Sequence, residues 1–253
     1  MSKLINNSIP YFVIFLFFIS FLNCKNFEEN ENIVQKNNTK IYLKKIPKDT
    51  ISIIETRKKI SDFIPIGYKI FEEIQADFNN DGIKDCIVII KGTNKENIIV
   101  DENRGKLDRN RRGIIALLKV KDNYELVVKN YDCFSSENED GGTYFAPELI
   151  VELEKSNLYI HYAHGRYGYW KYTFRLKNTD FELIGYDSSD NFGPRVNSET
   201  SINFLTKKKI TLTNTNENAE GGDEVFEEKI ERIKQQTTIK LSEILNFDEL
   251  EID

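Results

Sequence analysis

The chain has 253 residues, a formal net charge of −6 and 40% hydrophobic residues, including 17 phenylalanines. The negative net charge gives no reason to expect a basic face that could contact phosphates, so no nucleic-acid partner is expected. The apolar content is ample for a core, and the roughly 200 residues that follow the polar N-terminal region suit a single domain.

Residues 1–23 have the composition of a targeting segment. Lys3 gives a positive start, and an apolar core follows from Tyr11 to Ile19. That core is too short to span a membrane comfortably. Cys24 stands directly after Ser20-Phe21-Leu22-Asn23, an arrangement that resembles a bacterial lipoprotein signal. The resemblance implies that Cys24 is lipidated and becomes the mature amino terminus. An ordinary secretory peptide followed by an unrelated cysteine is the alternative.

Residues 24–48 are predicted to form a polar tether behind the lipid. Charged and amide residues dominate 28–32 and 35–40, and such a composition cannot bury enough apolar surface to fold. We therefore expect a lipid-anchored protein of a bacterial cell envelope, facing the periplasm or the cell surface. The expected partner is the membrane, to which the lipid anchor would attach the protein. Residues 49–253 would form the globular domain.

The strongest chemical signal is the stretch Asp77-Phe78-Asn79-Asn80-Asp81-Gly82-Ile83-Lys84-Asp85, which precedes the apolar run 86–90. Oxygen-bearing side chains occupy its first, third, fifth and ninth positions, a spacing that lets a short loop surround a hard cation. Gly82 supplies the backbone conformation of a sharp turn. Calcium is therefore the expected cofactor, with ligands from Asp77, Asn79, Asp81, the carbonyl of Ile83, and Asp85. A turn rich in Asp and Asn that binds no ion is the alternative.

These residues resemble the calcium loop of FG-GAP and VCBS-type β-repeats, whose pattern is D-x-[DN]-x-D-G-x-x-D before an apolar strand. Those families repeat the motif to build propellers, whereas this sequence holds one copy. The resemblance therefore implies a loop with its ion and not a repeat propeller. An EF-hand fits less well, because its twelfth position, a bidentate glutamate, is here Val88.

Alternating polar and apolar residues predict strands over most of the globular domain. The clearest case is 169–176, where Trp170, Tyr172 and Phe174 alternate with polar or exposed side chains. Other expected pairs, joined by short polar turns, are 68–74 with 86–90, 114–120 with 124–128, 148–154 with 158–162, 169–176 with 181–186, and 201–205 with 210–214.

Short turns between successive strands indicate an antiparallel meander. The predicted fold class is therefore all-β or mostly β, in a single domain. A short helix is expected over 50–62, because Ser52 and Glu55 have the spacing of a capping box. Residues 93–112 are expected to form a long polar insertion. Residues 227–233 are expected to form either a strand or a helical turn, and residues 241–250 a short capping element.

A binding surface is a candidate at the turn between Gly165 and Gly168. Aromatic and polar side chains concentrate there, and such surfaces stack on sugars, bases or peptides. The alternation assigns Tyr162, Trp170 and Tyr172 to the core. The remaining candidate ligand-binding residues are His164, Arg166, Tyr167 and Tyr169. The alternative is that these side chains only complete the packing of the sheet.

No catalytic residue is predicted, because the sequence has only two histidines and lacks the familiar nucleophile and metalloprotease motifs. The favoured interpretation is a binding or envelope-assembly module. The alternative is a hydrolase of an envelope polymer that uses paired carboxylates from the 135–147 loop, such as Glu137, Glu139 and Asp140. Cys86 and Cys133 are expected to remain unpaired, because a meander places them at opposite ends of the sheet.

Overall fold

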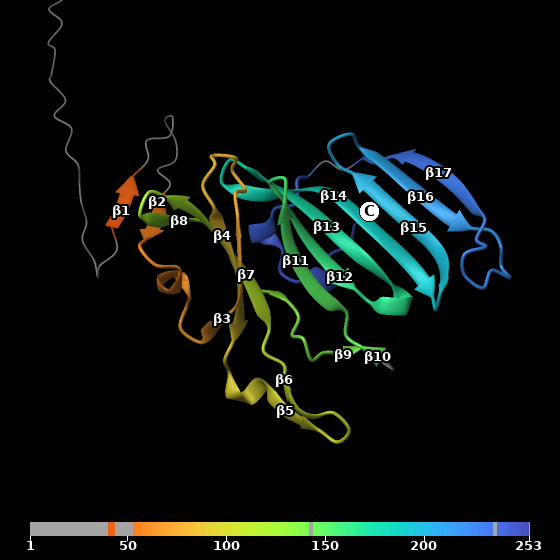
Figure 1. Ribbon diagram of the computed structural model, residues 1–253, viewed down its shortest axis with the longest axis horizontal. Coiled ribbons are helices and arrows are strands. Elements are labelled where there is room, and N and C mark those ends of the chain that lie inside the picture. Colours follow the sequence, from red (N-terminus) through yellow and green to blue (C-terminus); the bar gives the residue numbers. More distant parts are fainter. Residues whose placement is uncertain (1–39, 44–52, 142–143, 235–236, 253) are drawn as a thin grey trace, which may run out of the picture. The chain divides into compact units, whose positions relative to one another are not determined.

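The computed structural model describes residues 40–43, 53–141, 144–234 and 237–252 (Figure 1). Cys24 and the predicted targeting segment lie outside these residues. Antiparallel strands dominate the described chain, and its helices are 3₁₀ turns of three or four residues. The prediction of a mostly β protein is therefore confirmed. The sheets do not form a propeller, as expected from the single copy of the loop motif.

The first sheet has six strands in the order β1-β2-β8-β7-β4-β3. Their bounds are β1 Lys40–Leu43, β2 Ile53–Arg57, β3 Tyr68–Ala76, β4 Asp85–Gly92, β7 Arg112–Val120 and β8 Asn123–Phe134. A separate hairpin of β5 (Ile98–Asp101) and β6 (Gly105–Asp108) stands between β4 and β7 in the chain. The polar insertion predicted over 93–112 therefore contains a small hairpin.

Strand β4 lies between β7 and the edge strand β3 and is buried along almost its whole length. Every residue from Asp85 to Lys91 is buried. Val88 and Ile90 contribute to a cluster with Phe63 on one side of the sheet. Ile87 and Ile89 contribute to the main core on the other side. A strand buried on both faces loses the polar alternation of a surface strand, which explains its unbroken apolar run.

The second sheet is a seven-stranded meander in chain order, from β11 to β17. Its strands are β11 Glu148–Glu154, β12 Asn157–Ala163, β13 Gly168–Lys177, β14 Asp180–Phe192, β15 Arg195–Asn203, β16 Lys208–Asn214 and β17 Phe226–Arg232. Tyr162, Tyr172 and Phe174 are buried, and Trp170 is half-buried against the same core. The alternation read from the sequence is therefore confirmed for this face.

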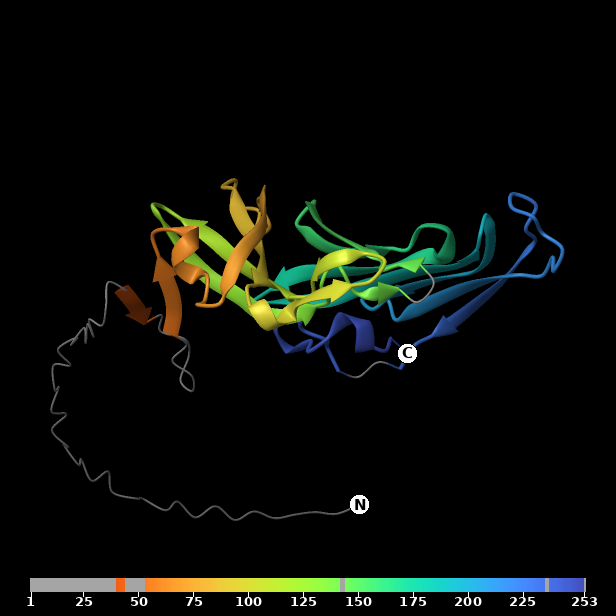
Figure 2. The ribbon, with the colours of Figure 1, turned by 90° about the horizontal axis from the view of Figure 1, so that it is seen from below.

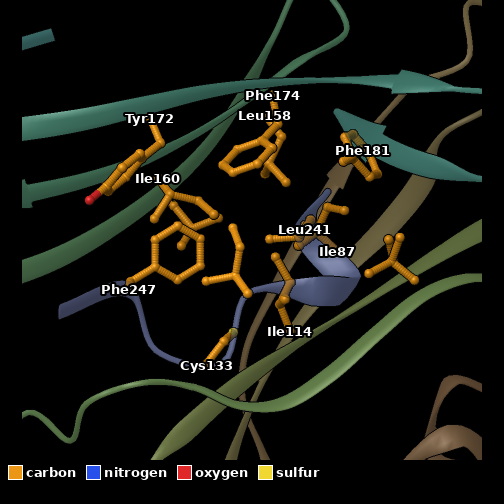
Figure 3. Packing of buried hydrophobic residues seen from close by; sticks show 14 of the residues in the cluster. Ile87, Ile114, Cys133, Leu158, Ile160, Tyr172, Phe174, Phe181, Leu241 and Phe247 are labelled. Carbon is orange, nitrogen blue, oxygen red and sulfur yellow. The ribbon is translucent and has the colours of Figure 1, made fainter. Parts of the chain in front are cut away.

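The main core joins both sheets and the C-terminal segment (Figure 3). The 3₁₀ turns η4 (Leu241–Glu243) and η5 (Phe247–Glu249) bring Leu241 and Phe247 into it. The Phe247 ring stacks on Phe134 of the first sheet at 5.1 Å and meets Tyr172 of the second edge-on at 5.1 Å. Figure 2 shows this C-terminal segment, in dark blue, along the sheets. The predicted capping element at 241–250 therefore fills the core between the sheets.

Two boundaries differ from the sequence predictions. The helix expected over 50–62 is wrong, because Ile53–Arg57 form β2 and only Ile60–Phe63 form a 3₁₀ turn, η1. Ile53, Ile54 and Thr56 are β-branched, so they favour a strand, and pairing with β8 overrides the capping-box spacing. Residues Lys40–Leu43, placed in the tether, instead form β1 against β2.

Cys86 and Cys133 are both buried and unpaired, as expected from their positions at opposite ends of the sheet. Burial is the main reason that the pKa of the Cys86 thiol rises to about 12. Within the described part of the chain, no helix is both long enough and apolar enough to cross a membrane.

Candidate functional site

The candidate ion loop connects β3 to β4, so it closes a hairpin of the first sheet as predicted. The Asp77 carboxylate accepts hydrogen bonds from the backbone N–H of Asp81 (3.2 Å) and of Gly82 (2.8 Å). Gly82 has a φ of +84°, a conformation that favours glycine. These bonds bend the chain around the Asp77 side chain, which is how an oxygen-lined loop turns within so few residues.

Oxygen atoms of the loop side chains lie close together. The backbone N–H of Asp81 lies 3.2 Å from Asp77 Oδ1 and 3.0 Å from Asn79 Oδ1, so both oxygens face one proton. Asn79 Nδ2 donates to Asp81 Oδ2 at 2.8 Å, and Ile83 N donates to Asp81 Oδ1 at 2.7 Å. Asp77, Asn79 and Asp81 are thus gathered on one exposed loop.

Asp85 has a role that the sequence interpretation did not assign. Its side chain is completely buried. One carboxylate oxygen accepts from Phe78 N at 3.1 Å, and the other accepts from Lys119 N of β7 at 2.9 Å. Burial raises the pKa of Asp85, although the two backbone hydrogen bonds oppose this, and the charges of Asp81 and Asp77 add to the increase. Asp85 therefore fastens the loop to the sheet.

The donor set of the loop suits a hard cation, because all of its side-chain donors are oxygen atoms. Asp77, Asn79 and Asp81 bring such oxygens onto one loop, but each of these oxygens already accepts a hydrogen bond within the loop, so their role as ligands stays a prediction. Asp85 already uses both oxygens on backbone groups, so its predicted role as a ligand stays a prediction, as does that of the Ile83 carbonyl. Among the described residues, no group of three or more His, Cys, Asp or Glu side chains is arranged to hold a metal.

The structure separates the four candidate ligand-binding residues into two places. His164 and Tyr167 lie together, with ring centroids 5.2 Å apart, and Arg166 stands between them in the turn η3 (Gly165–Tyr167). Tyr169 lies on β13 opposite Ser189 and packs edge-on against His161 at 5.4 Å. His161 and Tyr169 therefore share the sheet face that points away from the core residue Tyr162.

Gly168 explains why η3 can lie against the sheet. It has a φ of +103°, and a Cβ atom built there would lie 1.8 Å from the Ser189 carbonyl oxygen. Only glycine fits this close approach of β13 to β14. The turn is therefore held beside the end of β14, where further candidate residues occur.

A hollow of about 460 Å³ opens at this end of the second sheet. We call it the arginine hollow; it is lined by Arg166 and Tyr167 of η3, Phe192, Gly193, Pro194 and Arg195 at the β14–β15 turn, and Ala219 and Glu220 before β17. Gly221 supports its wall, because a Cβ atom there would lie 2.8 Å from Pro194 Cβ. Its volume lies within the range of small-molecule sites.

One wall of the arginine hollow was predicted from the sequence, and the other was not. Arg166 and Tyr167 were candidates, whereas Phe192 and Arg195 were not. The side chain of Phe192 is 69% exposed, and the Arg195 guanidinium lies 5.6 Å from its ring centroid. No hairpin was predicted at 192–195. The available clue was the Gly193-Pro194 dipeptide, which favours a turn, with an aromatic residue before it and an arginine after it.

The described carboxylates of the 135–147 loop are engaged within the protein. Glu137 forms an ion pair with Lys91, and Glu139 Oε1 accepts from Ser136 N at 3.2 Å and from Ser136 Oγ at 2.9 Å. Lys91, which is 2% exposed, also contacts Asp108 Oδ2 at 2.9 Å. The loop is therefore fastened to β4 and β6.

Comparison of the chain with protein-family models, with curated proteins and with solved structures gives no match. The geometry of the ion loop and of the arginine hollow is therefore the basis on which a function can be proposed.

Proposed function

We propose that this protein is a lipid-anchored binding module of a bacterial envelope, and that its ligand enters the arginine hollow. The observation that carries the proposal is the convergence of Arg166, Tyr167, Phe192 and Arg195 on one hollow from two separate turns. Phe192 offers an exposed apolar surface beside Arg195, so a ligand in the hollow could meet an aromatic ring and a cation together. Cys24 would hold the module at the membrane.

Calcium has a structural role in this proposal. Asp77, Asn79 and Asp81 would hold the ion at the tip of the β3–β4 hairpin, with the Ile83 carbonyl and Asp85 as further predicted ligands. The bound ion would neutralise carboxylates that otherwise repel one another. The main core begins beside this loop, because the buried ring of Phe78 meets Phe181 of the second sheet at 5.2 Å.

The contacts of the 135–147 loop do not favour the hydrolase alternative, since Lys91 holds Glu137 and Ser136 holds Glu139. Glycoside hydrolysis needs two carboxyl groups that face a bond across a cleft. The described carboxylates of this loop offer no such pair.

Amide NMR of the isotopically labelled domain, titrated with neutral, cationic and anionic small aromatic compounds, tests the binding proposal. We expect at least one compound to shift the amides of residues 164–167, 192–195 and 219–220 together. Shifts confined to other surfaces, or no saturable shifts, would contradict the assignment of the hollow as the binding site.

A further inference from the structure

We propose that the arginine hollow selects a ligand with an anionic group on a planar apolar body. This inference rests on the proposed binding function and names the chemical class of its ligand. The anionic group would meet Arg166 and Arg195, while the apolar body would lie against Phe192 and Tyr167.

The charge of the hollow differs in sign from that of the whole chain. The chain carries a formal net charge of −6, whereas the hollow contains two arginines and one carboxylate, Glu220. A local positive site on an acidic protein concentrates anions that the rest of the surface repels.

Both arginines retain hydrogen-bond donors for a ligand. Arg166 is exposed and forms no hydrogen bond or ion pair with any of the residues that the structure describes. Arg195 donates through Nε to Asn197 Oδ1 and through Nη1 to the Glu217 carbonyl, both at 3.1 Å. These two neutral acceptors orient the guanidinium without neutralising it, and its remaining donors match the oxygens of a carboxylate or phosphate.

The nearest carboxylates offset part of this charge without occupying the guanidinium. Glu224 accepts from the backbone N–H of Val196 at 2.9 Å and of Gly222 at 2.7 Å, and the charge of Arg195 adds to these bonds in lowering the Glu224 pKa. Arg195 donates to neutral acceptors instead, so its remaining donors face no described carboxylate contact. Glu220 lines the hollow and forms no ion pair with a described residue. It opposes an anion, so it would limit affinity and exclude ligands that carry a larger negative charge.

The apolar part of the ligand is inferred from Phe192. This residue is 69% exposed, although the other large apolar residues of its strand are buried or half-buried. Pro194 and Ala219 line the same hollow. A planar hydrocarbon body would cover this apolar area and stack on the ring, while the cation over Phe192 is attracted to both the ring and the anion.

The test compares five compounds by amide NMR titration: 2-naphthyl phosphate, 2-naphthoate, inorganic phosphate, 2-naphthol and 2-naphthylmethylammonium. We expect 2-naphthyl phosphate or 2-naphthoate to bind at the hollow about tenfold more tightly than phosphate or 2-naphthol. The two anionic compounds distinguish a phosphate from a carboxylate preference. Raising the salt concentration should weaken their binding, because the charged contact is partly exposed.

Four variants assign the contacts. Arg166→Ala should weaken the better naphthyl anion by about tenfold, whereas Arg175→Ala, an exposed arginine near the other end of β13, should leave it unchanged. Phe192→Ala should weaken the naphthyl anion but not inorganic phosphate. Leu205→Ala removes a comparably exposed apolar side chain at the other end of β15 and serves as its control.

Removing the negative charge of Glu220 should have the opposite effect on affinity to removing an arginine. Glu220→Gln should tighten an anion by a few-fold, whereas it would weaken a cationic ligand. If 2-naphthol or 2-naphthylmethylammonium binds the hollow as tightly as the anions do, the ligand class is wrong while the binding site stands. If none of the five compounds shifts the hollow, the inference fails and the proposed binding site fails with it.

Discussion

The hydroxyl of Ser156 donates a hydrogen bond to Asn80 Oδ1 at 2.6 Å, although the two residues are 76 positions apart. Ser156 belongs to the β11–β12 turn of the second sheet, and Asn80 belongs to the candidate ion loop of the first. Ser156 is buried, and its hydroxyl also lies 3.4 Å from the Asp77 carbonyl oxygen. The ion loop is thus joined directly to a turn of the other sheet.

The first prediction concerns this contact. Ser156→Ala should lower the free energy of unfolding by about 1–2 kcal/mol, because Asn80 loses a partly buried hydrogen-bond donor. Urea unfolding followed by circular dichroism measures the change. Ser198→Ala on β15, whose hydroxyl has no recorded partner among the described residues, is the control and should change stability by less than about 0.5 kcal/mol. Equal losses in the two variants would show that the Ser156–Asn80 bond contributes nothing.

The second prediction concerns calcium. At a hundredfold excess over its dissociation constant, the ion should stabilise the parent domain by roughly 2–3 kcal/mol. Asp81→Ala should remove most of this gain, because it deletes a central oxygen donor of the loop. Thermal melts with calcium and with chelator provide the measurement, and Asp122→Ala in the exposed β7–β8 turn is the control. Identical melting points for the parent in both buffers would make the loop a turn without an ion.

The third prediction follows from the raised pKa of Asp85. An acid whose folded-state pKa exceeds its unfolded value binds more protons in the folded state, so its contribution to stability falls as pH rises between the two pKa values. Without calcium, the free energy of unfolding should therefore contain a decreasing component from about pH 4 upward. Asp85→Asn should remove this component.

Urea titrations in chelator at a series of pH values measure the effect, with Asp122→Asn as the matched control. A decreasing component of the same size in the parent and in Asp85→Asn would assign it to another group. Asp85→Asn should also lower stability at every pH, since its amide N–H₂ would face a backbone N–H donor.

The fourth prediction concerns Lys91, the buried cation that holds Asp108 and Glu137. Lys91→Met should destabilise the domain by about 2 kcal/mol, less than a fully buried pair would lose, because both carboxylates are partly exposed to water. Burial alone would raise the pKa of Asp108, yet hydrogen bonds from Asn110 and Lys91 lower it to about 2. The variant should therefore raise the pKa of Asp108.

Carboxyl NMR titration and hydrogen exchange check this prediction. Exchange should accelerate in the β5–β6 hairpin and near residue 137, while β12 and β13 should retain their protection. Lys69→Met on the exposed edge strand β3 is the control. Unchanged exchange in the hairpin would show that the Lys91 contacts do not hold it.

The fifth prediction concerns Cys24, which lies outside the described residues. If Cys24 carries the lipid, the parent should partition into the detergent phase of a Triton X-114 separation. Cys24→Ala should accumulate as unprocessed precursor or appear as a soluble form, whereas Cys86→Ala should partition like the parent. A Cys24→Ala variant that partitions with the parent would contradict the lipoprotein interpretation.

Local patterns predicted the second sheet well, because its signals lie within one hairpin. Trp170, Tyr172 and Phe174 alternate with polar residues, and a strand with one buried face repeats every second residue. The helix predicted over 50–62 was wrong, because the capping-box spacing of Ser52 and Glu55 competes with a strand preference. The β-branched residues of this segment, Ile53, Ile54 and Thr56, carry that preference. Pairing with β8, more than 60 residues away in sequence, decides the outcome.

The candidate sites were predictable only where their residues are neighbours in the chain. The ion loop was found because Asp77, Asn79 and Asp81 follow one another closely. The hydrogen bond from Lys119 N to the Asp85 carboxylate could not be predicted from the sequence, because it depends on the pairing of β4 with β7. The arginine hollow likewise needs the β13–β14 register to bring Arg166 and Arg195 together.

The burial of β4 on both faces has a consequence for strand alignment. In most strands, a shift by one residue exposes apolar side chains to water, and this penalty fixes the register. In β4 such a shift would exchange Ile87 and Ile89 with Val88 and Ile90, so one apolar set would replace another. Hydrophobicity therefore discriminates poorly between the two alignments. Two buried charges at the ends of the apolar run break this degeneracy: Asp85 reaches Lys119 N, and Lys91 reaches Asp108 and Glu137. A slipped strand would leave both charges without partners, so polar contacts position a strand that is buried on both faces.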